Sequence, residues 1–155
     1  MKKVFTGILI CLIACCMAVC LTGCDNEYAK QEYNDAEKIV QDDRYGHGFY
    51  LLKHIDGGYS LTVSTFDGRQ TILKITREED VEIEMQLDLK ISSGTVKLVH
   101  IDCNNNITDL IECSEDSSNE QTATKTVFFT SGINRLKLVG YDCKGIDLKI
   151  IFDEP

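Results

Sequence analysis

The stretch that decides the fold runs from residue 81 to residue 91 and reads Val-Glu-Ile-Glu-Met-Gln-Leu-Asp-Leu-Lys-Ile. Apolar and polar side chains alternate along its whole length. Successive side chains of a β-strand point to opposite faces of its sheet, so this pattern predicts a strand with one buried and one solvated face. The end of the chain repeats the alternation less strictly, with Ile146, Leu148, Ile150 and Phe152 as its apolar positions. Both segments therefore predict strands that cover one apolar core.

Further short strands are predicted around this stretch, separated by turns rich in Gly, Asn and Asp. Gly and Asn adopt positive φ at small cost and so favour tight turns. The predicted strands span residues 49–55, 59–66, 70–76, 81–91, 95–101, 107–113, 124–130, 134–141 and 145–152. This spacing, with one polar face per strand and no helical period, predicts an all-β fold: an antiparallel, jelly-roll-like β-sandwich of about 8–9 strands.

One pattern occurs twice, in residues 93–103 and 131–143. Its shared form is Ser-Gly, a short gap, and then Lys-Leu-Val-x-Ile/Tyr-Asp-Cys. A single repetition does not indicate a solenoid, which needs at least three units. We interpret the two copies as strands with similar roles in two packed sheets, and chance similarity between strands is the alternative.

The N-terminus has the composition of an export signal. Lys2 and Lys3 precede an almost unbroken apolar run over residues 5–20, which is short for a membrane-spanning helix of about 20 apolar residues. The run is followed by Leu-Thr-Gly-Cys at residues 21–24, which resembles the lipobox of bacterial lipoproteins. The resemblance implies cleavage before Cys24 and a diacylglyceryl group, with palmitate-type chains, on the Cys24 sulfur. The alternative is an uncleaved anchor helix with an incidental cysteine.

The chain accordingly divides into three predicted parts: a lipoprotein signal peptide over residues 1–23, a lipidated cysteine with a polar tether over residues 24–45, and a β-sandwich domain over residues 46–155. The tether is predicted because residues 25–45 are acidic and lack a clear apolar face. It would act as a spacer or, alternatively, as a functional tail. The implied location is the extracytoplasmic face of the cell membrane, where acyl chains hold the protein.

A second resemblance concerns the body of the chain. Its residues are the turns Phe66-Asp67-Gly68, Glu78-Glu79-Asp80 and Ser93-Gly94 with their flanking strands, and the segment 132–140. These resemble small cell-surface lipoproteins of Gram-positive gut bacteria. The resemblance covers residues 59–152 and implies a jelly-roll sandwich related to galactose-binding-like modules. Because its motifs are strand and turn patterns, no catalytic or ligand residue is carried over.

The net charge and the absence of catalytic and metal-binding motifs argue against several classes of function. The chain has 25 Asp and Glu against 16 Lys and Arg, a net charge of −9, which argues against binding nucleic acid or anionic lipid. No Gly-x-Ser-x-Gly motif and no metal-ligand spacing of histidines occurs, so we predict no enzyme activity, no metal and no cofactor. A glycan-active enzyme, the alternative, would need two carboxylates about 5–9 Å apart in a deep pocket. Glu82 and Glu84 are expected instead on the wet face of their strand.

Cysteines offer one candidate site. The cysteines before Cys24 leave with the signal, and Cys103, Cys113 and Cys143 remain in the predicted domain. Exported proteins can keep disulfides. If consecutive strands run up and down, Cys113 and Cys143 lie at the same end of the sandwich and Cys103 at the other. A Cys113–Cys143 disulfide is therefore possible, and three free thiols are the alternative.

Acidic and amide side chains offer a second candidate. Asp102, Asn104, Asn106 and Asp109 cluster around one predicted turn and could supply oxygen ligands to Ca²⁺. The alternative is a tight turn rich in Asn. The complete calcium-loop pattern with its central Gly is absent.

The sequence thus predicts an anchored, non-catalytic module that binds a ligand, with carbohydrate as one possibility, or an envelope protein. A structural or protein-interaction lipoprotein without a small ligand is the alternative. Sugar binding would need an aromatic platform, and the candidates are Tyr45, Phe49, Tyr50, Tyr59 and Tyr141. We expect most of them to pack in the core or along edges, since large rings dominate cores.

Overall fold

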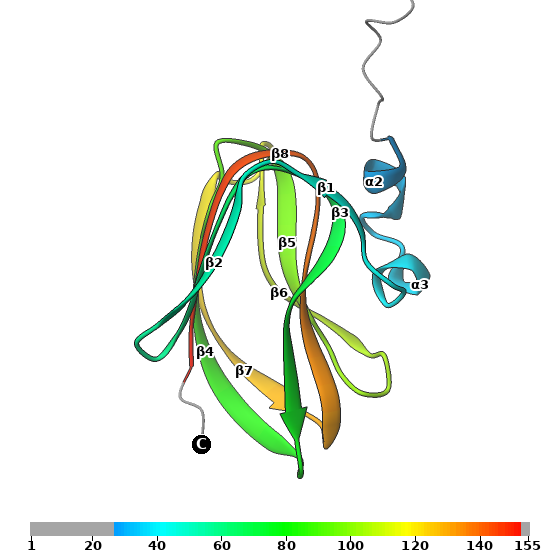
Figure 1. Ribbon diagram of the computed structural model, residues 1–155, viewed down its shortest axis with the longest axis vertical. Helices are drawn as coiled ribbons and strands as arrows, with labels where there is room; N and C mark the ends of the chain where they lie inside the picture. The colour runs from blue at the N-terminus through cyan, green and yellow to red at the C-terminus, as the bar shows by residue number, and fades with distance from the viewer. Residues whose placement is uncertain (1–26, 153–155) are drawn as a thin grey trace, which may run out of the picture.

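The computed structural model describes residues 27–152, and Figure 1 shows two short helices beside a body made of strands. The predicted signal peptide and Cys24 lie outside the described residues. The helices are α2 (Glu27–Glu32) and α3 (Ala36–Ile39). The strands are β1 (Arg44–His47), β2 (Tyr50–Ile55), β3 (Gly58–Arg77), β4 (Val81–Lys90), β5 (Ser93–Ile101), β6 (Ile107–Ser114), β7 (Glu120–Phe129) and β8 (Gly132–Ile151). Neither described helix has the length and apolarity to span a bilayer.

All eight strands pair antiparallel in one connected network, which folds over into two layers because β3 and β8 each run through both. Residues 58–66 of β3 pair with 143–151 of β8, and residues 68–77 pair with 132–140. Sheet I contains β2, the first half of β3, the second half of β8, β4 and β7. Sheet II contains β1, the second half of β3, the first half of β8, β5 and β6. The predicted antiparallel β-sandwich is confirmed.

Two predicted turns are bends within long strands, which corrects the predicted strand boundaries. The chain was expected to reverse between the predicted strands 59–66 and 70–76, and again between 134–141 and 145–152. Strands β3 and β8 instead continue through these positions and arch over one end of the sandwich (Figure 1). Gly68 has φ +103 and no room for a side chain, since a Cβ would lie 2.1 Å from the Arg44 carbonyl oxygen. The two bends are joined where the Asp142 N–H donates to the Asp67 carboxylate at 2.7 Å.

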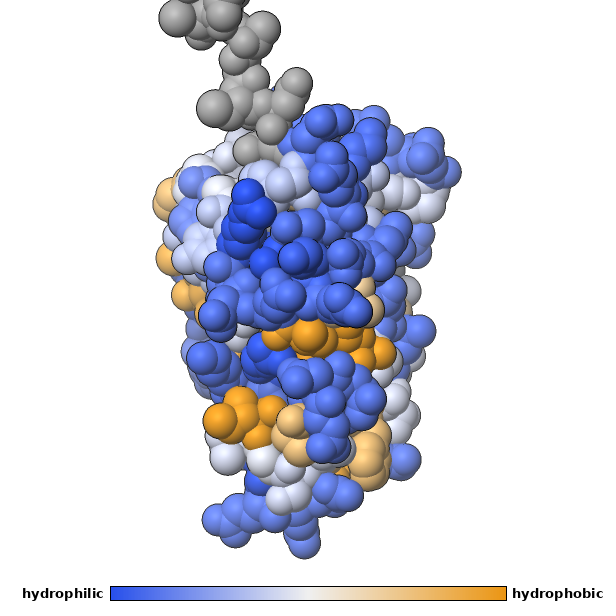
Figure 2. Space-filling model, turned by 90° about the vertical axis from the view of Figure 1, so that its right-hand side faces the viewer, coloured by the Kyte–Doolittle hydropathy of each residue, from blue (hydrophilic) through white to orange (hydrophobic). Residues whose placement is uncertain are grey.

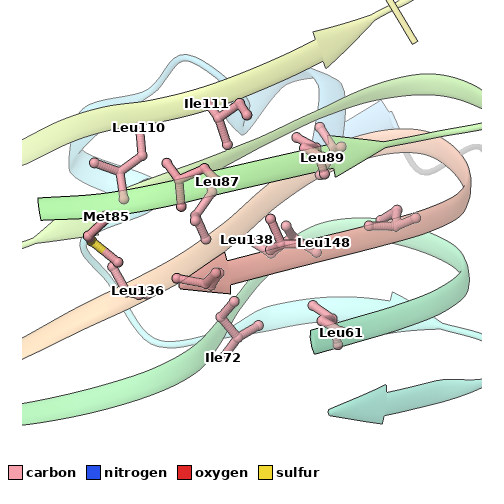
Figure 3. Close-up of a cluster of buried hydrophobic side chains, with 14 of the residues drawn as sticks. Leu61, Ile72, Met85, Leu87, Leu89, Leu110, Ile111, Leu136, Leu138 and Leu148 are labelled. Atoms are coloured by element: carbon pink, nitrogen blue, oxygen red, sulfur yellow. The ribbon is translucent and has the colours of Figure 1, made fainter. Parts of the chain in front are cut away.

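The core lies between the two sheets and consists of the apolar positions that alternate along the strands. Met85, Leu87 and Leu89 of β4 are at most 1% exposed, whereas Gln86 between them is exposed and Asp88 is partly exposed. Figure 3 shows the three buried side chains meeting side chains of β3, β6 and β8, among them Leu61, Ile72, Leu110, Ile111, Leu136, Leu138 and Leu148. Apolar burial of this extent is the main source of the stability of the sandwich.

The predicted solvated tether is wrong for the residues that the structure describes. Residues 27–43, here called the strap, pack against the outer face of sheet II (Figure 1). Ala29, Tyr33 and Ile39 are 2%, 5% and 2% exposed. Tyr33 and Ile39 form one apolar cluster with Val99, Ile101 and Val139 of the sheet. Three apolar side chains in an acidic segment do not form an obvious stripe, so the sequence pattern concealed this contact.

The two copies of the repeated pattern do not lie in two packed sheets, as we interpreted them from the sequence. They are neighbouring strands of one sheet, since β5 pairs with β8 and Leu98 lies opposite Leu138. The Lys-Leu-Val triplets therefore run antiparallel across this pair. Leu98 and Leu138 point into the core, so both lysines point to the outer face of sheet II, beneath the strap.

Candidate functional site

An open groove follows the first half of β4. Strand β8 ends at Ile151, which pairs with Gln86, so within the described residues 81–85 have a strand partner only on the β7 side. The groove beside this edge has a volume of about 370 Å³. Its lining consists of Val81, Glu82, Ile83, Glu84, Gln86, Ile151 and Phe152.

The groove combines an apolar floor with a polar rim. Ile83 and Phe152 are buried, at 4% and 3% exposure, whereas Glu82, Glu84 and Gln86 are exposed on the outer face. Phe128 lies directly across from Glu82 on β7, and its ring is 52% exposed. Carboxylates accept and amides both donate and accept hydrogen bonds, while an exposed ring offers an apolar face. These are the groups that bind the hydroxyls and the C–H faces of a sugar.

The two carboxylates of the rim are poorly placed for catalysis. Glu82 and Glu84 stand two residues apart on one strand, a spacing of about 7 Å, which is within the range used by glycosidases. A general acid of that kind needs a buried carboxyl with a raised pKa. Both glutamates are exposed on the sheet surface, so the groove favours binding over hydrolysis.

The aromatic residues predicted for sugar binding are divided among three places. Tyr50 and Tyr59 pack against the core, and Tyr141 lies under the strap, edge-on to Tyr33 at 5.2 Å. Both sets therefore have packing roles, as expected from the sequence. Tyr45 and Phe49 differ, because they are 44% and 61% exposed.

Tyr45 belongs to a row of stacked rings along the β1–β2 edge. Its ring centroid is 5.2 Å from that of His47, and His47 is 5.0 Å from Tyr50. These rings cover one another's faces, which leaves less ring surface for a ligand than Phe128 offers. Arg44, the neighbour of Tyr45 on β1, instead stacks its guanidinium on the Tyr28 ring of α2 at 3.9 Å.

Four cations on the outer face of sheet II are here called the cationic face: Arg69, Lys97, Arg135 and Lys137. Sequence reasoning did not identify them. The Lys137 side chain is fully buried, and its Nζ donates to the Gln41 carbonyl at 2.7 Å and lies 3.1 Å from Asp43 Oδ1. Burial lowers the pKa of Lys137, and Asp43 opposes this shift. The carboxyl pKa of Asp43 is raised by burial but lowered more by hydrogen bonds from Thr71 and Lys137, so it lies below its ordinary value.

The predicted calcium ligands are accounted for without a cation. The Asp102 carboxylate accepts hydrogen bonds from the N–H groups of Asn104 and Asn106, both at 2.8 Å, and from the Asn106 side-chain amide at 2.7 Å. Asp109 points elsewhere and accepts from Lys97 Nζ at 3.1 Å. The structure thus places three of the four residues in one turn and separates the fourth. Among residues 27–152 no cluster of three or more His, Cys, Asp or Glu side chains could hold a metal.

The three cysteines of the sandwich are free thiols. Cys113 and Cys143 both lie in the main core cluster, but no disulfide joins them. Burial raises the pKa of Cys113 to about 11 and that of Cys143 to about 12. Cys103 is exposed, and its sulfur accepts a hydrogen bond from the Thr130 hydroxyl.

A buried polar pair was also missed by sequence reasoning. His100 is 2% exposed and its Nε2 lies 3.0 Å from Asn134 Oδ1, while Asn134 is fully buried. Burial lowers the pKa of His100. His100 stands two residues after the core residue Leu98 on β5, a spacing that places it on the core face. Its partner on β8 could not be predicted from the pattern.

Comparison with known proteins gives fold-level likeness only. No family model and no curated protein matches the chain. A carbohydrate-binding module of Cellvibrio mixtus lichenase 5A, in complex with cellotriose, is 11% identical with a TM-score of 0.38, over 77% of this chain and 94% of that one. A family 29 carbohydrate-binding module in complex with mannohexaose is 14% identical with a TM-score of 0.39, over 72% and 77%.

A third similar structure is a larger protein, an exo-β-1,3-galactanase of Phanerochaete chrysosporium with galactose. It is 13% identical with a TM-score of 0.39, and the match covers 73% of this chain but only 30% of the galactanase. No ligand or activity is carried over from these proteins.

Proposed function

We propose that the chain is an extracytoplasmic lipoprotein, attached through Cys24, whose sandwich is a non-catalytic carbohydrate-binding module. The observation that carries this proposal is the groove along β4, with its floor of Ile83 and Phe152 and its exposed polar rim. Ligand sites are typically concave and mostly apolar, with a few polar groups that fix orientation. Phe128 extends the surface beyond Glu82.

The position of the strap supports this arrangement. Only Asp25 and Asn26 separate Cys24 from Glu27, the first residue of α2, and a chain of three residue steps spans at most about 11 Å. A lipid on Cys24 would therefore hold the α2 end of the sandwich at the membrane. In Figure 1 the start of β4 lies at the opposite end from α2, so the groove would face away from the bilayer.

The negative charge of the rim determines which class of carbohydrate the groove would bind. Glu82 and Glu84 are exposed carboxylates in a chain of net charge −9, and they would repel uronates and phosphate-bearing glycans. The ligand proposed is a neutral or amino-sugar-containing glycan.

A glycan array followed by calorimetry on the hits tests the proposal. The protein for this test begins at residue 24 and carries Cys24→Ser, and it contains every residue described in the sandwich. We expect Phe128→Ala and Gln86→Ala to weaken binding about tenfold or more, equivalent to about 1.4 kcal/mol each. Phe49→Ala is the matched control, because Phe49 is also an exposed ring but does not line the groove, and it should change affinity less than twofold.

Two results would count against carbohydrate binding: no signal across plant, host and cell-wall glycans, or equal losses in Phe128→Ala and Phe49→Ala. An envelope protein is the second candidate, because the free edge at residues 81–85 could accept an extended peptide as an added strand. Hydrogen exchange separates the two ligands. A peptide would protect the β4 edge amides, whereas a sugar on the rim would not.

Lipidation is tested separately in a bacterium that processes lipoproteins. The parent protein should incorporate a labelled fatty acid, and Cys24→Ala should abolish this incorporation. A parent protein that stays in membranes without incorporating label would support an uncleaved anchor helix instead.

A further inference from the structure

The cationic face is a compact array on the three central strands of sheet II. Arg69 on β3 and Lys97 on β5 both lie opposite Val139 of β8, so their Cα atoms are about 10 Å apart, two strand spacings. Lys137 and Arg135 follow on β8 itself, each about 7 Å further along the strand. These four cations lie together although the chain has 25 acidic residues and a net charge of −9.

The strap satisfies three of these cations with oxygen atoms. Arg69 donates to the Glu32 carboxylate and to the Asp42 carbonyl, the latter at 3.1 Å. Arg135 donates to the Val40 carbonyl at 3.0 Å, and Lys137 contacts Gln41 and Asp43. Lys97 is the exception, because its carboxylate partner Asp109 belongs to the sheet, although the Tyr33 ring of the strap lies 4.9 Å from its Nζ.

The strap is attached more weakly than the rest of the fold. Its helices contain six and four residues, and helices this short are not stable alone. Its apolar contacts form a small cluster, separate from the main core, and the remainder of its surface is hydrophilic (Figure 2). The strap could therefore leave while the sandwich stays folded.

We propose that the cationic face is a second binding face, for a polyanion whose carboxylate or phosphate groups replace the oxygens of the strap. The strap is then an internal occupant that keeps this face closed. This site lies on the opposite sheet from the groove, and it does not depend on what the groove binds.

The test compares strap release with loss of the cations, in the soluble protein that begins at residue 24 with Cys24→Ser. Tyr33→Ala with Ile39→Ala removes the two buried side chains that the strap contributes to the small apolar cluster, and neither belongs to the main core. The probes are polyphosphate and poly-glutamate, with neutral dextran as the negative control. Vesicles of phosphatidylglycerol distinguish a lipid phosphate from a soluble polymer.

We expect the released variant to bind one of the polyanions at least about tenfold more tightly than the parent protein, with affinity that falls as salt increases. Adding Lys137→Met should abolish the gain, whereas adding Lys149→Met should not, because Lys149 lies on the same strand but on the outer face of sheet I. Binding to vesicles alone would assign the phosphate to lipid.

Hydrogen exchange shows whether the strap has left the sheet in the double variant. If the strap amides exchange rapidly while those of β5 and β8 stay protected, and neither polymer nor vesicle binds more tightly, the proposal is wrong. If the double variant unfolds, Glu32→Gln with Asp43→Asn decides instead. It keeps the apolar contacts and removes two strap carboxylates, so unchanged polyanion binding in this variant would also overturn the proposal.

Discussion

The buried ammonium of Lys137 lies 3.1 Å from the carboxylate of Asp43, and this pair connects the strap to the central strand of sheet II. Lys137 has no exposed side-chain surface, whereas the Asp43 side chain is 32% exposed. Most of the free-energy cost of removing this pair from water therefore falls on the lysine. The oxygens that compensate this cost come from the strap, which the sequence predicted to be a spacer.

We expect Asp43→Asn to destabilise the protein by about 1–3 kcal/mol, because a buried charge loses its counterion. Asp42→Asn is the matched control, since only the backbone carbonyl of Asp42 contacts Arg69, and it should change stability by less than about 0.5 kcal/mol. Urea unfolding at neutral pH measures both. Equal effects would show that Lys137 does not depend on this carboxylate.

The same pair predicts an acid response. The pKa of Asp43 is lowered in the folded state, so its contribution is complete above the unfolded value near 3.8 and is lost as the pH falls through the folded pKa. Strap amides should therefore exchange faster relative to the sandwich at pH 3 than at pH 5, as measured by hydrogen exchange corrected for intrinsic rates. Asp43→Asn should remove most of this difference.

His100 predicts a second pH effect, at higher pH. Burial lowers its pKa below 6.5, so between the folded pKa and 6.5 the unfolded chain binds more protons. The free energy of unfolding should consequently fall as the pH is reduced from 7.5 to 5.5. His100→Gln should reduce this slope and His54→Gln should not, because His54 is exposed. Identical slopes in all three proteins would contradict the prediction.

Thiol reactivity should follow burial. At pH 8, iodoacetamide should modify Cys103 in the native protein and leave Cys113 and Cys143 unmodified, because burial raises their pKa values to about 11 and about 12 and the thiolate is the reactive form. Peptide mass spectrometry identifies the modified residues. Denaturant should expose all three, and early modification of Cys143 would indicate that the core opens near the strand bends.

The turn at Asp102 should be stable without metal. Asp102→Ala removes the acceptor of three hydrogen bonds and should cost about 1–3 kcal/mol. The melting temperature of the parent protein should be the same in calcium and in EDTA. A rise with calcium that disappears in Asp102→Ala would restore the calcium-site hypothesis.

Much of the fold could be predicted from the residues, and much of the site could not. The alternation at residues 81–91 assigned β4 and its buried face correctly, since that pattern depends only on neighbouring residues. The bends at Gly68 and Gly145 were read as reversals, because a glycine with positive φ serves a tight turn and a bent strand equally well. The groove was missed because it exists only where β8 stops beside β4.

The sequence by itself determined the strand periodicity, the sandwich class, the acidic balance and the export pattern that ends at Cys24. Each is encoded in residues that are close together in the chain. Only the tertiary structure decided that the two Lys-Leu-Val triplets are neighbours in one sheet, and that the strap covers the lysines that they contribute. Those facts depend on which strands pair and on charges that meet across more than 90 residues, as Asp43 and Lys137 do. No local pattern specifies such a contact.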